Sequence, residues 1–206
     1  MDNRRPFRVL MLVILAVLSA CAGTKIINPW KDPAFSGGLK KVFVIGVVRT
    51  RGPRGVLEDE FVHQFKARGI DAVASTAVLA DEAVPARDVV APKVREAGAD
   101  SVLVVKFIKK VSAEAYSPAR LYAMPYNFDA EWDATTAATE WADSGLNEIS
   151  YDYTVAVMQT TLYAVGTGKP VWSATSETKY QGALMHQVHP FVNAIMKKLK
   201  QEKLIP

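Results

Sequence analysis

The sequence contains a single cysteine among its 206 residues and only three histidines. One cysteine excludes an intramolecular disulfide, so the fold has to be held together by its core alone. No stripe of Lys and Arg interleaved with aromatic residues occurs, which argues against nucleic-acid binding. The formal net charge of +4 is weak evidence for an anionic partner, because Arg4, Arg5 and Arg8 against Asp2 place +2 of it in residues 1–20.

The apolar run at residues 9–18 is too short to cross a bilayer. Ten helical residues rise about 15 Å, half of the roughly 30 Å hydrocarbon core. The run follows the basic segment 1–8 and is followed by small residues. This order is typical of a signal peptide, which we expect to span residues 1–20.

Leu18, Ser19, Ala20 and Cys21 stand directly after the apolar run and resemble the bacterial lipobox. The resemblance implies that a lipoprotein signal peptidase recognises the first three residues and cuts before Cys21. It also implies that Cys21 carries a covalent diacylglycerol, usually with a further amide-linked acyl chain. The alternative is an ordinary signal peptide whose cleavage site happens to precede a cysteine. Ala22 in place of Asp resembles cargo sorted to the outer membrane, with the inner membrane as the alternative.

Residues 21–39 are rich in Gly, Pro, Asn and Ser and predict a lipidated tether. Trp30 is the largest apolar side chain between residues 22 and 38 and either docks on the domain or rests at the lipid headgroups.

Residues 40–206 are expected to form a single globular domain, long enough for one well-buried core. Apolar runs, helical periodicity and turn residues predict a definite order of elements. They are strand 41–48, helix 53–68, strand 70–74, helix 88–97, strand 101–108, strand 151–164, strand 170–178 and helix 183–203. The order β-α-β-α-β, insertion, β-β, α predicts an α/β (α+β) fold with a mixed sheet covered by helices.

Residues 65–73 and 94–102 repeat one pattern, in which a helix end, a glycine and a short turn lead into a strand. Strand–helix–strand connections of this kind favour parallel pairing.

An aromatic-rich insertion at about 110–149 breaks this pattern and exceeds the usual length of a loop. Its side chains Tyr122, Tyr126, Trp132 and Trp141 either form a partner surface or complete the core.

Several stretches resemble a group of small bacterial envelope lipoproteins: WKDP at 30–33, KKVFVIG at 40–46 and YAVGTGKPVW at 163–172. The element order is similar to the mixed-sheet domain of the TolB amino-terminal, curli-secretion lipoprotein and penicillin-binding-protein-activator lipoproteins. This resemblance implies a binding or assembly module and supplies no catalytic residues.

Three arginines follow the first strand of the domain and precede its first helix: Arg49, Arg51 and Arg54. Ligands of parallel α/β sheets tend to lie at this edge, and a helix N-terminus with arginines can hold a phosphate or carboxylate. The alternative is a basic loop with no ligand. The neighbouring acidic residues 58–60 fan out about 100° apart on a helix, so they do not converge, and their place near a helix start explains them.

His186 and His189 have the i, i+3 spacing that can place two imidazoles on one helix face. A zinc site usually needs a third or fourth ligand, for which Glu177 is the nearest acidic candidate, so a surface pair without metal is expected.

The sequence therefore predicts a non-catalytic, periplasm-facing lipoprotein of the outer membrane that binds another envelope protein or a second copy of itself. We expect no cofactor other than the lipid on Cys21, no metal, no enzymatic activity and no nucleic-acid partner. The alternative is a periplasmic sensor or enzyme for a small anion or a metal, using the arginine loop or the histidine pair.

Overall fold

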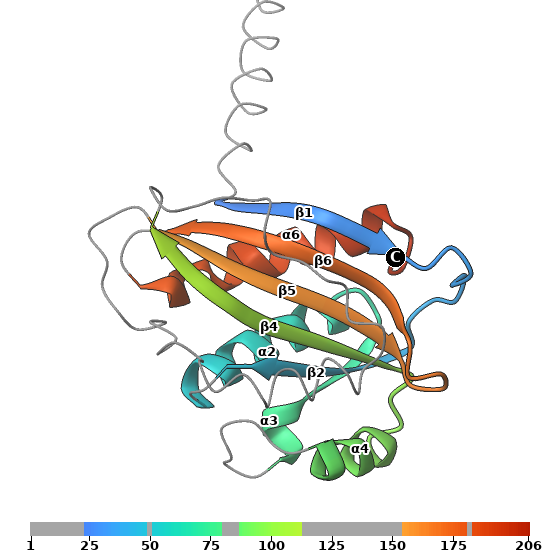
Figure 1. Cartoon of the computed structure of the whole chain (residues 1–206). Helices are drawn as coiled ribbons and strands as arrows, with labels where there is room; N and C mark the ends of the chain where they lie inside the picture. The colour runs from blue at the N-terminus through green and yellow to red at the C-terminus, as the bar shows by residue number, and fades with distance from the viewer. Residues whose placement is uncertain (1–22, 49–50, 80–86, 113–153, 181–182) are drawn as a thin grey trace, which may run out of the picture.

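A mixed six-stranded sheet with strand order β1-β6-β5-β4-β2-β3 forms the centre of the structure (Figure 1). The structure is a computed structural model that describes residues 23–48, 51–79, 87–112, 154–180 and 183–206. The strands are β1 (Thr24–Lys31), β2 (Lys41–Val47), β3 (Asp71–Ala74), β4 (Ser101–Ser112), β5 (Thr154–Ala164) and β6 (Pro170–Tyr180). The helices are α2 (Arg51–Lys66), α3 (Ser75–Val78), α4 (Arg87–Glu96) and α6 (Val188–Gln201), with a 3-10 turn η4 (Leu184–Gln187). The predicted mixed sheet and its covering helices are confirmed.

Strand β2 lies between β3 and β4 and pairs with both in parallel, as the two β-α-β connections predict. Its side chains are buried on both faces of the sheet, with Val42 and Val44 in one core and Phe43 and Ile45 in the other. A run of β-branched and apolar residues is typical of such a central parallel strand.

The two repeated segments end their helices with the same motif. Gly69 and Gly98 have φ of +75° and +64°, the left-handed conformation that glycine adopts without steric cost. In the first copy the amide of Ile70 donates to the carbonyl of Phe65, and in the second copy the amide of Ala99 donates to the carbonyl of Val94. Each is a Schellman cap, which turns the chain from the helix into the next strand.

The other half of the sheet is antiparallel. Strand β5 pairs with β4 on one side and with β6 on the other, and the β5–β6 hairpin closes through residues 165–169 with Gly168 at φ +65°. The strand–turn–strand arrangement predicted for this stretch is confirmed, and the GTGK sequence at 166–169 belongs to a turn and not to a phosphate loop.

Strand β1 lies within the range for which the sequence predicted a tether. Residues 24–31 form an edge strand antiparallel to β6, so the structure differs from that prediction over this segment. The irregularity between Ile27 and Trp30, where Asn28 has φ +47°, hides the strand pattern in the sequence. The Lys31 ammonium donates to the carbonyl of Glu202 at 2.8 Å, which fastens the far end of β1 to the end of α6.

Helices cover both faces of the sheet. The larger core lies between the sheet and helices α2 and α6, where Phe61 contacts Phe65 and Phe191 with ring centroids 6.4 Å and 5.9 Å apart. A smaller core lies under α4, whose Val90 and Val94 pack on β2 and β4. The apolar spacing predicted for α2 and α6 is confirmed by these contacts.

Replacing Phe61 by Ala should destabilise the domain strongly, because the ring is fully buried between two helices. We expect a loss of about 3–5 kcal/mol in the free energy of unfolding. Val56 on the same helix is 49% exposed, so Val56→Ala should change the free energy of unfolding by no more than about 0.5 kcal/mol. Urea titration of both variants checks this, and equal midpoints for the two would contradict the assignment of the core.

Candidate functional site

The carboxyl ends of β2 and β3 meet the start of α2, where the sequence predicted an anion site. Strand β3 ends at Ala74 opposite Val44, while β2 continues beside β4 as far as Val47. The last residues of β2 therefore have no β3 partner on that side, and their backbone groups need another one.

The side chain of Glu58 from α2 fills this gap and is fully buried. One carboxylate oxygen accepts from the Gly46 amide at 2.8 Å and from the Ser75 hydroxyl at 2.7 Å. The other accepts from the Thr76 amide at 2.8 Å and from its hydroxyl at 2.9 Å. The carboxylate thus takes the place of a missing strand and also binds the first turn of α3.

Arg54 lies one helical turn before Glu58, is 1% exposed, and places its Nε 3.6 Å from a Glu58 oxygen. Its stem packs on the backbone of Gly46, where an added Cβ would come within 3.1 Å of the Arg54 Cγ. A larger residue at position 46 would therefore press on this buried pair.

The sequence predicted Arg54 as one of three ligands for an anion, whereas the structure places its guanidinium inside the fold beside the Glu58 carboxylate. Arg49 lies outside the described residues, and Arg51 is the first residue of α2. An open hollow beside the network is lined by Gly52, Gly55, Val56, Asp59, Thr76 and Ala77, with an acid and no base among them. Glu58 also differs from the helix-start residue that the sequence predicted, because it is buried in the second turn of α2.

At the opposite end of these strands Lys41 forms a salt bridge of 2.9 Å with Asp71. The hydrogen bond and the charge of Lys41 lower the pKa of the Asp71 carboxyl. Both side chains are partly exposed, so this pair belongs to the surface.

The two histidines are placed on the surface by η4 and α6. His189 is 63% exposed, and its Nδ1 lies 2.8 Å from Glu60 of helix α2. Its Nε2 lies 2.8 Å from the amide of Asn193. Both ring nitrogens are thus occupied, one by a contact that joins α6 to α2 and the other by a contact within α6. In the part of the chain that the structure describes, no three His, Cys, Asp or Glu side chains gather as a metal site.

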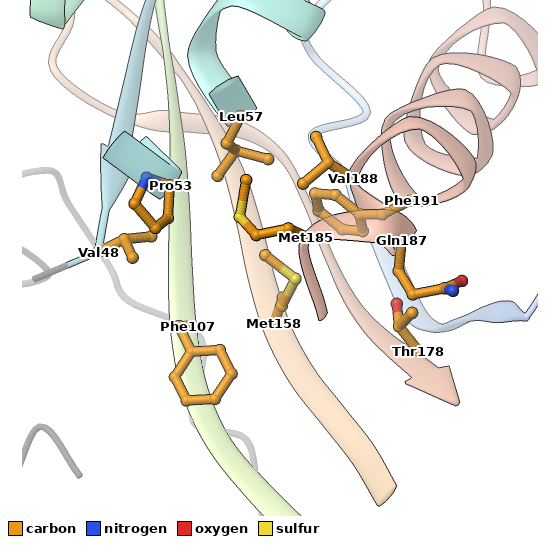
Figure 2. Close-up of a pocket in the computed structure, with 10 residues that line it drawn as sticks. All are labelled: Val48, Pro53, Leu57, Phe107, Met158, Thr178, Met185, Gln187, Val188 and Phe191. Carbon is orange, nitrogen blue, oxygen red and sulfur yellow. The ribbon is translucent and has the colours of Figure 1, made fainter. Parts of the chain in front are cut away.

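A narrow apolar pocket opens beside the first turns of α2 and α6 (Figure 2). Its cavity volume is about 20 Å³, room for about one water molecule. Its walls come from α2, α6, η4 and strands β4, β5 and β6, with one residue just beyond β2. They are Val48, Pro53, Leu57, Phe107, Met158, Thr178, Met185, Gln187, Val188 and Phe191.

Sequence reasoning missed this pocket because its walls come from segments far apart in the chain. The clearest signal in the sequence is the pair of methionines Met158 and Met185 in two segments far apart in the chain.

The remaining predicted site residues lie outside the described part of the chain. They are the lipobox residues Leu18, Ser19, Ala20 and Cys21 and the aromatic residues Tyr122, Tyr126, Trp132 and Trp141 of the insertion. No helix among the described segments has the length and apolar character needed to span a membrane.

Comparison with known proteins finds fold likeness alone. No protein-family model matches the sequence, and no curated protein matches it. A PelC dodecamer from Paraburkholderia phytofirmans is 17% identical, with 85% of this chain and 96% of that chain covered and a TM-score of 0.47. The lipoprotein GNA1162 from Neisseria meningitidis is 11% identical over 79% and 99% of the two chains, with a TM-score of 0.41. Protein XCC0632 from Xanthomonas campestris is 10% identical over 86% and 91%, with a TM-score of 0.39. These scores are too low to assign a function, and the resemblance to TolB-type and curli-type domains stays a prediction.

Replacing Glu58 by Gln should destabilise the domain, because an amide nitrogen cannot accept the bonds that one carboxylate oxygen now accepts. It also removes the negative charge that lies beside the buried Arg54 guanidinium, and we expect a loss of about 3–5 kcal/mol. Asp59→Asn, at the exposed neighbouring position, is the matched control and should change stability by no more than about 0.5 kcal/mol.

Chemical denaturation of both variants and of the double variant Arg54→Met, Glu58→Gln measures the coupling. The double variant should lose less than the sum of the two single ones. Additive losses would show that Arg54 and Glu58 do not act as a pair.

Proposed function

We propose that this chain is a lipoprotein of the bacterial envelope, anchored through acyl groups on Cys21 and acting as a non-catalytic binding or assembly module. The observation that carries the proposal is the lipobox resemblance of residues 18–21, followed within three residues by Thr24, the first residue of an edge strand. An anchoring cysteine at the mature N-terminus would thus pass almost directly into a folded domain.

The short distance between anchor and sheet supports a domain that works close to the membrane. Only two residues lie between Cys21 and Thr24, so the Cα atoms of Cys21 and Thr24 are at most about 11 Å apart. Two or more acyl chains hold a protein on a bilayer stably, whereas one chain is marginal. The domain would therefore stand next to the lipid headgroups and not at the end of a long tether.

The closed network around Glu58 supports a module over an enzyme. In open α/β sheets the carboxyl edge of the parallel strands is where ligands bind. Here the buried carboxylate at that edge is fully engaged with Gly46, Ser75 and Thr76. Its hydrogen bonds serve the fold, so among the described residues the Glu58 carboxylate is already engaged and is not available as a base.

The partner of such a module would be another envelope protein or a second copy of this chain. The aromatic residues of the insertion, among them Trp132 and Trp141, remain our candidates for the contact surface because aromatic side chains often anchor interfaces. The outer membrane is the proposed location, based on Ala22.

The variant Cys21→Ser tests the anchor, because a hydroxyl cannot replace the thiol in the thioether to diacylglycerol. We expect the wild-type chain to mature to residues 21–206 with acyl mass on its N-terminal peptide and to incorporate labelled fatty acid. Cys21→Ser should lose the acyl mass, the label and cleavage before residue 21, while Ser36→Ala, an exposed site after β1, should behave as the wild type. A mature wild-type protein without acyl groups would overturn the proposal.

The variant Ala22→Asp tests the location. Under the enteric-type sorting rule, aspartate at this position retains a lipoprotein in the inner membrane. We expect the wild-type protein to separate with outer-membrane fractions of an enteric host and Ala22→Asp to separate with inner-membrane fractions. Inner-membrane fractionation of both proteins would contradict the outer-membrane assignment but would not contradict the proposed lipid anchor.

A further inference from the structure

We propose that the narrow apolar pocket between α2, α6 and the sheet receives one of the acyl chains carried by Cys21. This inference rests on the lipid anchor proposed above. It adds a specific place for one chain on the domain itself, in addition to the chains that enter the bilayer.

The start of β1 lies against the wall of the pocket. The hydroxyl of Thr24 is 2.9 Å from that of Thr178, a lining residue. The carbonyl of Gly23 accepts from the amide of Lys179 at 2.7 Å. A Cβ added to Gly23 would lie 3.5 Å from the Oε1 of Gln187, the other polar lining residue. The chain is therefore held beside the pocket two residues after Cys21.

The chemistry of the walls fits an apolar ligand. Eight of the ten lining residues are apolar, and the two polar ones are Thr178 and Gln187. Figure 2 shows these two close together on one side of the pocket, with Val48 and Phe107 across from them. The Thr178 side chain is fully buried and its hydroxyl contacts that of Thr24, so the wall that a ligand meets is almost wholly apolar and suits the methylenes of an acyl chain.

The shape of the pocket favours an unbranched chain over a bulkier group. The cavity volume is only about 20 Å³, room for about one water molecule. An acyl chain therefore enters only if lining side chains move, and an aromatic ring or a branched group requires a larger movement. Met158 and Met185 line it, and methionine is the apolar side chain that adapts most easily to a new neighbour. A thin, flexible chain can enter by displacing these two thioethers.

The length of chain between the pocket and the anchor permits this contact. The Cα of Cys21 lies at most about 7 Å from that of Gly23. The acyl chain starts from that point and needs no further polypeptide to reach Thr178 and Gln187. One chain in the pocket and the others in the bilayer would restrict how the domain turns on the membrane surface.

The methionine methyl groups provide a direct test in the mature lipidated protein, placed in nanodiscs of fully deuterated phospholipid. With ¹³C-methyl methionine, we expect nuclear Overhauser contacts from Met158 and Met185 to acyl methylenes, which can then come only from the protein's own lipid. Met196 is fully buried in the same core and does not line the pocket, so it should show no such contact. A Cys21→Ala chain exported through an ordinary signal peptide should show shifted Met158 and Met185 resonances and an unchanged Met196 resonance.

Each other outcome counts against the pocket. A protein that carries acyl mass on Cys21 but shows no methylene contact at Met158 or Met185 overturns this inference and leaves the anchor intact. Contacts that appear only with protonated phospholipid would assign the pocket to a membrane lipid instead. Contacts to protein side chains that grow with concentration would assign it to a second copy. Absence of acyl mass would overturn the anchor itself.

Discussion

The antiparallel pairing of β1 with β6 decides how the domain meets whatever precedes it in the chain. Through this pairing Gly23 and Thr24 are bonded to Lys179 and Thr178, so the polypeptide is already part of the sheet three residues after Cys21. An unpaired segment here would act as a flexible spacer, whereas a paired strand fixes the position of the residues that directly follow the proposed anchor. The placement of the proposed anchor, its distance from the membrane and its access to the apolar pocket all follow from this one contact.

The same pairing connects the two ends of the domain. Strand β1 has eight residues and helix α6 has fourteen, so the two advance by similar lengths of about 23 Å and about 20 Å. They lie close at one end through Gly23 and Gln187 and at the other through the Lys31 bond to Glu202. Since α6 also packs on α2 through Phe191 and Phe61, the edge strand is tied to the main core and not only to β6.

Much of the fold is predictable from the sequence because it depends on local patterns. The β-branched run after Lys40 predicts β2, the spacing of Leu57, Phe61 and Phe65 predicts the buried face of α2, and Gly69 and Gly98 mark the helix ends. Strand β1 is not predictable in this way. Asn28 with its positive φ and the neighbouring Pro29 interrupt the alternation, and the partner strand lies some 150 residues away, as in the Thr24–Thr178 contact.

The buried network around Glu58 is likewise not predictable from local sequence patterns. Glutamate on a helix is usually solvated, and the sequence around Glu58 gives no reason to expect otherwise. Its burial depends on β3 being shorter than β2, which leaves the Gly46 amide without a strand partner. Arg54 is buried beside Glu58, so a side chain that the sequence predicted as an anion ligand lies inside the fold. The pocket, too, exists only after α2, α6 and three strands have come together.

Hydrogen exchange of the lipidated protein, followed on the peptide that spans Cys21 to Lys31, tests the central claim most directly. Its mass reports whether Cys21 carries acyl groups, and its deuterium uptake reports whether the backbone after Cys21 is paired. We expect acyl mass together with slow exchange of the amides that β1 donates to β6. A peptide of unmodified mass, or one whose amides all exchange at the earliest time, would contradict it.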